Sequence, residues 1–427
     1  MSSSAPAVDP QLSADGLSKA QEFKRGWPLL VAAGFGAAVG VSPLIQFTLG
    51  PFMEPLSHEF GWSRAEISAA GLAKSIGLLL VSVVVGMLAD RYGARRVALT
   101  SQLLLAGGFL AMAFLPGNLW LFYTGYVLLI LLGAGTLTMV WSRAVVGWFA
   151  AGRGLALGVS LMGIGLIGGL TPSYVTWLIA EHGWRGAYVG LAALPLLVGF
   201  PLAYLWFREP PKEPVAETRA TAQVQPETGW TLGQAMGTLA FWQLSLFYFL
   251  GAVGVFGALT HAVPMLTDRG LDRASSAALM SIFGVSVGLG RLITGQLLDM
   301  FKAERLVAVL FVLPAAGCLL LLFGGGNAVL CGIGLSLLGF AGGVEGDSGA
   351  YLVAKYFGRA HFGAIYGLLV ALTILGGGIG PLLIGHSFDK TGSYDLSLAI
   401  GIGTFLAASL LVLTLRWGNV RSAGPAR

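Results

Sequence analysis

Twelve apolar runs, each long enough for one helical crossing of a lipid bilayer, constrain this chain more than any other feature. The hydrocarbon core is about 30 Å thick, so an α-helix needs about 20 mostly apolar residues to span it. Because lipid offers no hydrogen bonds, such runs must satisfy their own backbone as helices. The sequence predicts an all-α integral membrane protein whose twelve helices lie near 27–52, 66–88, 97–115, 119–145, 154–180, 185–207, 241–266, 275–298, 306–324, 328–353, 362–386 and 395–416.

The composition excludes several other classes. Hydrophobic residues make up 56% of the 427 residues and charged residues 11%, whereas a typical soluble domain carries about 25% charged residues. We therefore expect neither a soluble enzyme, nor a disordered chain, nor a nucleic-acid partner. The two cysteines lie in apolar runs and indicate no disulfide framework. No nucleophile elbow, phosphate loop or His/Cys cluster is found, so we expect no enzyme activity, no metal and no cofactor.

The positive charges predict an orientation. If both termini are inside, most of the 25 lysines and arginines fall in inside segments, as the positive-inside rule requires. We expect a multi-pass protein of the cell (inner or plasma) membrane, embedded in the lipid bilayer, with cytoplasmic tails at 1–26 and 417–427. The Pro- and Glu-containing segment 208–240 would be a cytoplasmic linker. It separates an N-terminal six-helix bundle, 27–207, from a C-terminal one, 241–416.

The two halves of the chain repeat each other at an offset of 209 residues. Landmarks from four separated places fit this single offset. Parallel six-helix repeats characterise secondary transporters, whose substrate site lies between the halves near the bilayer midplane. The matched pairs are Gly61 and Gly270, Arg64 and Arg273, Gly86 and Gly295, Asp90 and Asp299, Arg96 and Arg305, Gly158 and Gly367, and Gly183 and Gly392.

Short segments carry a family resemblance. GMLADRYGARRVAL, at 86–99, resembles the signature loop between helices 2 and 3 of the major facilitator superfamily, and 295–305 resembles its weaker copy. The segments 148–163, 284–299 and 342–367 are similar to the monocarboxylate porter and oxalate/formate porter branch. The resemblance implies two pseudo-symmetric six-helix bundles, transport by alternating access, and gating rather than substrate contact for Asp90, Arg91, Arg95, Arg96 and Asp299.

This chain departs from the branch at several positions. Animal monocarboxylate carriers have a helix 1 lysine implicated in proton coupling, and helix 1 here has none. Val287 stands where an acidic residue precedes their helix 8 arginine by one turn. The second, helix 11 cation of the oxalate porter has no counterpart within 362–386, which argues against a small dicarboxylate held by two cations. The fifth helix also departs from the drug/proton antiporter signature.

Four charged residues lie within predicted spans away from their ends: Lys74, Arg291, Glu345 and Asp347. A charged group inside a membrane helix is costly and is by default a functional-site hypothesis. Arg291 stays charged at cellular pH and can bind a carboxylate bidentately, so we expect it to bind substrate; an internal salt bridge is the alternative. We expect Lys74 to snorkel outward, with a second positive charge in the anion path as the alternative.

Glu345 and Asp347 are the expected proton-coupling residues. Two residues apart, they point about 200° apart on a helix and are not expected to share a metal site. One of them could pair with Arg291, and a carboxyl balanced between burial and an arginine can release a proton when the cavity opens inward. The alternative is structural pairing between helices 10 and 11.

Four further residues complete the expected substrate-binding set. His261 titrates in the useful pH range, although an interfacial histidine bonded to a neighbouring helix is an equal alternative. Gln46 carries an amide that needs a partner in lipid. Tyr126 and Tyr366 are aromatic candidates for the cavity wall, with packing as their alternative.

The sequence as a whole predicts a monomeric secondary active transporter. Its expected cargo is a small organic anion, foremost a monocarboxylate, carried in symport with a proton by alternating access. Exchange of organic anions is one alternative, and efflux of drugs or other metabolites by proton antiport is another. A membrane sensor that keeps the fold without transporting is a third.

Overall fold

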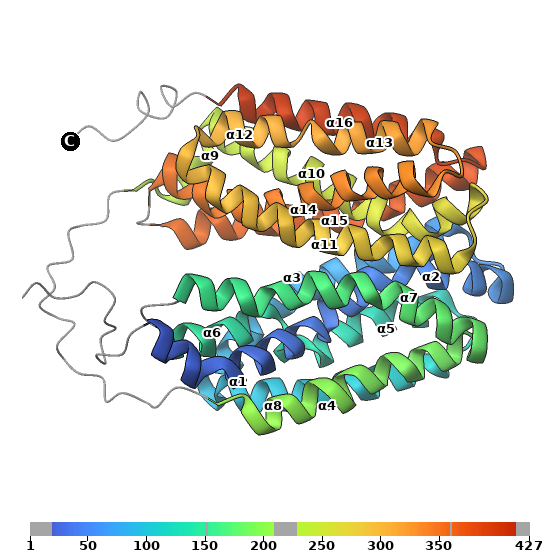
Figure 1. Cartoon of the computed structure of the whole chain (residues 1–427), viewed down its shortest axis with the longest axis horizontal. Coiled ribbons are helices and arrows are strands. Elements are labelled where there is room, and N and C mark those ends of the chain that lie inside the picture. The colour runs from blue at the N-terminus through green and yellow to red at the C-terminus, as the bar shows by residue number, and fades with distance from the viewer. Residues whose placement is uncertain (1–18, 150–152, 209–228, 359–360, 416–427) are drawn as a thin grey trace, which may run out of the picture.

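The computed structural model describes residues 19–149, 153–208, 229–358 and 361–415, which are almost entirely helical (Figure 1). The first half contains α1 (Lys19–Ala38), α2 (Val41–Phe60), α3 (Arg64–Tyr92), α4 (Ala94–Ala113), α5 (Leu119–Leu132), η1 (Ala134–Thr136), α6 (Thr138–Trp148), α7 (Arg153–Ala193), η2 (Leu194–Gly199) and α8 (Phe200–Trp206). The second half contains α9 (Leu232–Met236), α10 (Leu239–Asp268), α11 (Arg273–Met300), α12 (Ala303–Leu310), α13 (Leu313–Phe323), α14 (Ala328–Phe357), α15 (Phe362–Thr391) and α16 (Asp395–Leu413).

The helices account for the predicted crossings. Within the described ranges, eight helical segments are long and apolar enough to span a membrane, and the bent pair of α1 and α2 makes a ninth. One of the eight, 155–206, has 52 residues, or about 78 Å at 1.5 Å per residue, too long for one crossing. It divides at Gly183, whose φ of 70° breaks the helix. With α3 and the consecutive α5 and α6, the predicted all-α membrane fold is confirmed.

Two of these crossings are themselves broken, and the breaks meet. The first is interrupted between α1 and α2, which bend by 40°, and the fourth is interrupted at η1. The Thr136 hydroxyl accepts a hydrogen bond from the Val41 N–H at 2.9 Å and donates to the Gly133 carbonyl at 2.6 Å. A side chain at the second break therefore satisfies the Val41 N–H freed by the first.

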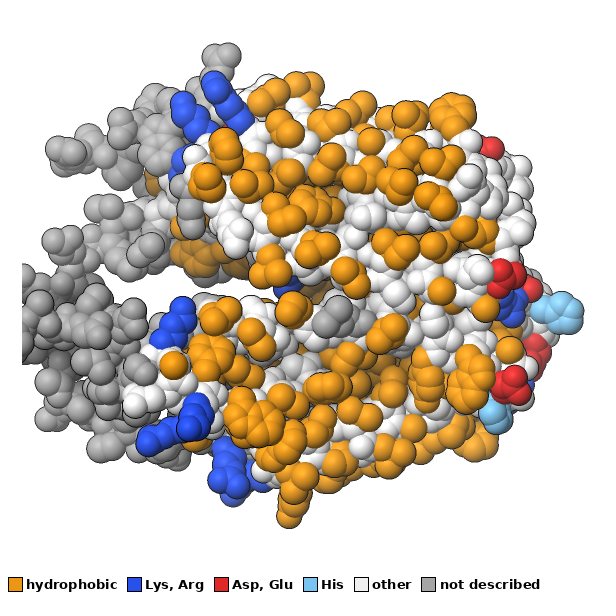
Figure 2. Space-filling view, in the orientation of Figure 1, with side chains coloured by type: hydrophobic (Ala, Val, Ile, Leu, Met, Phe, Trp, Pro, Cys, Tyr) orange, Lys and Arg blue, Asp and Glu red, His pale blue; other side chains and the backbone are white. Residues whose placement is uncertain are grey.

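Each half has its own buried core, one built from residues between 29 and 207 and the other from residues between 235 and 415. In Figure 1 the halves lie side by side. The end of α8, the start of α9 and the end of α16 lie at one end of the molecule, which we call the linker end because residues 209–228 connect α8 to α9 in the sequence. In Figure 2 the halves are separated at the linker end, where Lys and Arg gather, and meet at the opposite end, where Asp, Glu and His gather. We call this opposite end the closed end.

Small residues allow the halves to meet along two seams. At one seam α7 packs on α11, where Ser281 Oγ donates to the Gly169 carbonyl at 3.1 Å. A methyl group on Gly284 would lie only 2.4 Å from the Gly165 carbonyl oxygen. At the other seam α15 packs on α3, and a methyl group on Gly385 would lie 2.8 Å from a backbone oxygen of α3. Both contacts require glycine because the opposing atoms are backbone.

The tightness of the α7–α11 seam can be tested with matched alanines. Gly284→Ala places a methyl group against backbone that cannot move aside, so we expect a stability loss of about 1–3 kcal/mol, the usual cost of overpacking. Gly288→Ala, one turn further along α11, meets no atom within 4 Å and is the control. Thermal unfolding of the purified protein in detergent measures both. Equal midpoints for the two variants would contradict this seam.

Candidate functional site

Arg291 lies on α11, 18 residues after the start of that helix at the closed end. Its side chain is partly exposed, its Nε is buried without a hydrogen-bond partner, and no ion pair joins it to any described residue. The backbone beneath it is fixed by α14, because a methyl group on Gly343 would lie 2.7 Å from the Arg291 nitrogen. Arg291 is thus held on a closely packed helix pair, and no described carboxylate compensates its charge.

Glu345 lies on α14 and is 6% exposed. Its Oε1 is buried without a partner. Gly251 of α10 leaves room for the carboxyl group, since a methyl group there would lie 3.6 Å from the carboxyl carbon and 3.1 Å from the Phe311 ring. In this conformation the possible pair between Glu345 and Arg291 is not formed within the described part of the chain. The side chain of Asp347 lies outside the described residues.

An aromatic and hydroxyl cluster lies nearby in the second half. Tyr248 OH and Ser348 Oγ are 3.0 Å apart, joining α10 to α14. A methyl group on Gly349 would lie 3.1 Å from the Tyr366 ring and 3.2 Å from Tyr248 OH. Tyr366, which was expected at the site, therefore lies close to Gly349 and Tyr248, in the same half of the molecule as Arg291. Ser348 was missed by sequence reasoning, and its only signal was its place between Asp347 and a glycine.

Tyr126 and the expected gating residues lie away from this cluster. Tyr126 is buried in the core of the first half, 4.9 Å from the Phe122 ring. At the linker end, Arg95 Nη2 donates to the Tyr204 carbonyl of α8 at 2.6 Å. Arg91 lies over the Tyr92 ring and Arg96 is exposed. The side chains of Asp90 and Asp299 lie outside the described residues.

Lys74 does not snorkel, so that expectation was wrong. Its side chain is only 8% exposed, and its Nζ donates to Oε1 of Gln46 on α2. The contact is possible because Lys74 faces inward from α3 while Gln46 faces it from the neighbouring helix. Gln46 therefore has a partner, as a buried amide requires, and that partner is a buried cation.

Arg64 ties the closed end together. It is the first residue of α3, just after the Ser63 cap, and its guanidinium binds both oxygens of Asp268 on α10, at 2.6 and 3.0 Å. It also bonds the Tyr394 hydroxyl and stacks on the Phe388 ring at 3.8 Å. Asp268, Phe388 and Tyr394 all belong to the second half, so one side chain from the first half engages three groups across the seam.

A carboxylate of the second half also caps α3. Asp389 accepts the backbone N–H groups of Arg64 at 3.0 Å and Ala65 at 2.8 Å. The N-terminus of a helix offers unpaired N–H donors and a positive dipole end, both of which favour an anion. We call Arg64, Asp268, Asp389 and Tyr394 the Arg64 clasp.

His261 is buried beneath the Arg64 clasp. Its Nε2 is 2.9 Å from the Pro381 carbonyl oxygen and 3.1 Å from Ser68 Oγ, and its Nδ1 is 3.1 Å from Tyr394 OH. Because a carbonyl can only accept, Nε2 carries the proton and Nδ1 accepts from Tyr394. Burial raises the pKa of Tyr394 and keeps that hydroxyl protonated. His261 thus joins α10, α15 and α3 at the seam, as the interfacial alternative described.

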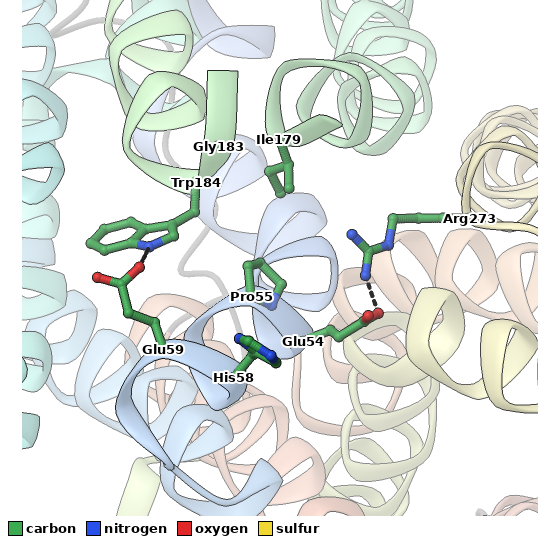
Figure 3. A pocket seen from close by; sticks show the side chains of 8 residues that line it. All are labelled: Glu54, Pro55, His58, Glu59, Ile179, Gly183, Trp184 and Arg273. Atoms are coloured by element: carbon green, nitrogen blue, oxygen red, sulfur yellow. Dashed lines mark hydrogen bonds and ion pairs between the residues drawn. The ribbon is translucent and has the colours of Figure 1, made fainter. Parts of the chain in front are cut away.

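The repeat partner of Arg64 makes the reverse contact. Arg273 begins α11 after the Asp272 cap and pairs with Glu54 of α2, in the first half. Figure 3 shows this pair at the rim of a closed-end recess, where Glu59 turns toward Trp184. Both carboxylates of the recess are already engaged, so it belongs to the seam and offers no free acidic ligand.

Comparisons with known proteins agree with this architecture. Residues 35–381 match the family model described as Major Facilitator Superfamily. The chain is 28% identical to monocarboxylate transporter 11 of Mus musculus, over 91% of this chain and 88% of that protein. It is 27% identical to a gallate transporter of Pseudomonas putida, over 78% and 82%. A D-xylose–proton symporter structure superposes with a TM-score of 0.71 at 16% identity, covering 92% of this chain and 98% of that one.

Loss of the Arg64 clasp should open the closed end. Hydrogen bonds to charged groups contribute about 1.5–3 kcal/mol, so Arg64→Ala should shift the open–closed equilibrium at least tenfold toward opening. The reporter is Ser75→Cys, buried at the α3–α15 seam, with Cys318 and Cys331 replaced by alanine. Labelling by an impermeant maleimide from the closed end should be about tenfold faster in Arg64→Ala.

The matched control removes an ion pair that does not cross the seam. Arg185 binds Glu59 at 2.7 Å at the same end, and both residues belong to the first half. Arg185→Ala should leave the labelling rate unchanged. Equal rates in the Arg64 and Arg185 variants would show that the clasp does not hold the halves together.

Proposed function

The chain belongs to the Major Facilitator Superfamily, and from that premise we propose that it carries small organic anions, foremost monocarboxylates, in symport with a proton. The family consists of membrane transporters and not of enzymes. The observation that carries the proposal is the guanidinium of Arg291, which lies on the closely packed α11–α14 pair and has no ion-pair partner among the described residues. A positive charge at this depth of a membrane helix is costly without an anion, and a carboxylate fits its planar fork.

The names of two relatives also support an anionic substrate. The mouse relative is named for monocarboxylates and the Pseudomonas putida relative for gallate, and both names denote carboxylates.

The halves are apart at the linker end and joined at the closed end. A substrate released by Arg291 in this conformation would leave through the linker end, which is the cytoplasmic side if the predicted orientation holds.

Glu345 is our candidate for the coupled proton. A buried carboxylate without a donor or a cation is costly, and Oε1 of Glu345 has neither among the described residues, which favours the protonated form of this carboxyl. With a proton on Glu345 and an anion on Arg291, the loaded carrier adds no net charge to the membrane crossing. Each uncompensated charge would otherwise involve about 2.3 kcal/mol per 100 mV of potential, which makes the paired movement favourable.

Arg291 variants test the anion site. In proteoliposomes supplied with radiolabelled pyruvate or gallate, Arg291→Lys should reduce uptake and Arg291→Met should reduce it at least 100-fold, because methionine keeps the bulk but loses the charge. Thermal unfolding checks that each variant still folds. Wild-type uptake of either anion by Arg291→Met, or transport of cationic drugs that ignores this change, would contradict the proposal.

Glu345→Gln separates binding from coupling. The amide keeps the size of the carboxyl but cannot release a proton, so exchange of labelled for unlabelled anion should continue at near the wild-type rate. Accumulation driven by a pH gradient should be lost. Full retention of that accumulation would remove Glu345 from the coupling role and favour anion exchange at Arg291.

A further inference from the structure

A second cation that has no ion-pair partner among the described residues lies in the first half, at another depth. Lys74 is ten residues from the closed-end start of α3 and Arg291 is 18 residues from the closed-end start of α11. At 1.5 Å per residue these positions differ by about 12 Å along the helices. The repeat offset of 209 places Phe283 opposite Lys74 and Ser82 opposite Arg291. The two cations are therefore not symmetry mates, and they lie at different depths along their helices.

Among the residues that the structure describes, an amide is the only partner of the Lys74 amine. Its hydrogen-bond acceptor is Gln46 Oε1, and no described residue forms an ion pair with it. A lysine ammonium has three donors and needs acceptors for all of them. A neutral amide satisfies one donor and none of the charge, which leaves the group poised for an anion. A purely structural lysine at this depth would be expected to have a carboxylate partner.

The faces of α3 show where Lys74 points. Ser68 and Ser75 face the seam, since they contact His261 and the Gly378 position of the second half. Leu80 faces outward and is 65% exposed. At 100° per residue Lys74 lies on a third face, between the seam and α5. It is therefore directed into the molecule and not toward lipid.

Gln46 lies next to the surface that the seam covers. Gly50 and Glu54 follow it at four-residue intervals on α2, and both meet the second half. A methyl group on Gly50 would lie 2.4 Å from the Thr260 carbonyl oxygen, and Glu54 pairs with Arg273. Separation of the halves at the closed end would uncover this face of α2 and, with it, the Lys74–Gln46 pair.

Resting on the proposed function, we propose that Lys74 and Gln46 form a second binding station for the carboxylate of the substrate, nearer the closed end than Arg291. When the closed end is open, the Lys74 ammonium binds the incoming anion. When the seam closes, Gln46 Oε1 replaces the anion on the amine and the substrate passes to Arg291. The structure then corresponds to the state in which Gln46 occupies the amine and Arg291 is ready to bind or has released.

The second binding station is tested by measuring KM separately from the closed end and from the linker end. Radiolabelled pyruvate and gallate are presented separately to the closed end and to the linker end, in vesicles sorted by orientation. Lys74→Gln should raise KM at least tenfold from the closed end and less than twofold from the linker end. Lys74→Arg, which restores the charge, should return the closed-end KM to within about threefold of wild type. A merely structural lysine would change both faces equally.

A second variant keeps the test valid if Lys74→Gln fails to fold. Gln46→Glu gives the amine a permanent carboxylate partner, so stability should be kept or raised while the station is blocked. Its closed-end KM should rise at least tenfold. A wild-type closed-end KM in folded Gln46→Glu, or equal shifts at both faces, would overturn the station. The proposed function fails separately, through transport that survives Arg291→Met.

Discussion

The contacts of Arg64 with two carboxylates of the second half hold the closed end together, and every other group is observed in this conformation. One guanidinium binds Asp268 through both oxygens, while Asp389 caps the helix that carries it. These contacts seal the closed end, and the halves are apart at the linker end. Within the described part of the chain, Arg291 has no ion-pair partner, Oε1 of Glu345 has no hydrogen-bond partner, and Lys74 has only an amide in this conformation.

Internal duplication explains why the seal has two sides. The repeat places an arginine directly after the N-cap of α3 in the first half and of α11 in the second. Each arginine pairs with a carboxylate of the other half. The exchange is not symmetric in strength, because only the Arg64 side gains a helix cap, an aromatic stack and a buried histidine. The repeat thus accounts for the two arginines, whereas Asp389 and Tyr394 stand where the first half has Ala180 and Arg185.

Sequence patterns predicted the fold and the short inventory of buried charges, because lipid forces apolar helices and makes each internal charge conspicuous. Partners were harder to predict, since they depend on tertiary placement. Lys74 was expected at the interface with water, but Gln46 lies within its reach on α2. His261 was expected beside the substrate, yet its contacts belong to the seam. The repeat marked Arg64 and Arg273 as equivalent positions but did not reveal that each pairs with a carboxylate of the other half. Ser348 had only its place between Asp347 and a glycine as a signal.

The hydroxyl of Thr136 has a mechanical consequence. It bonds the first peptide of α2 and a carbonyl before η1, so the breaks in the first and fourth crossings share one support. The Trp141 indole also donates to the Thr136 carbonyl, at 3.1 Å. Moving one crossing without the other would leave the Val41 N–H without its acceptor. The linker-end parts of these two crossings, α1 and α6, are therefore expected to move together about this shared hydrogen bond.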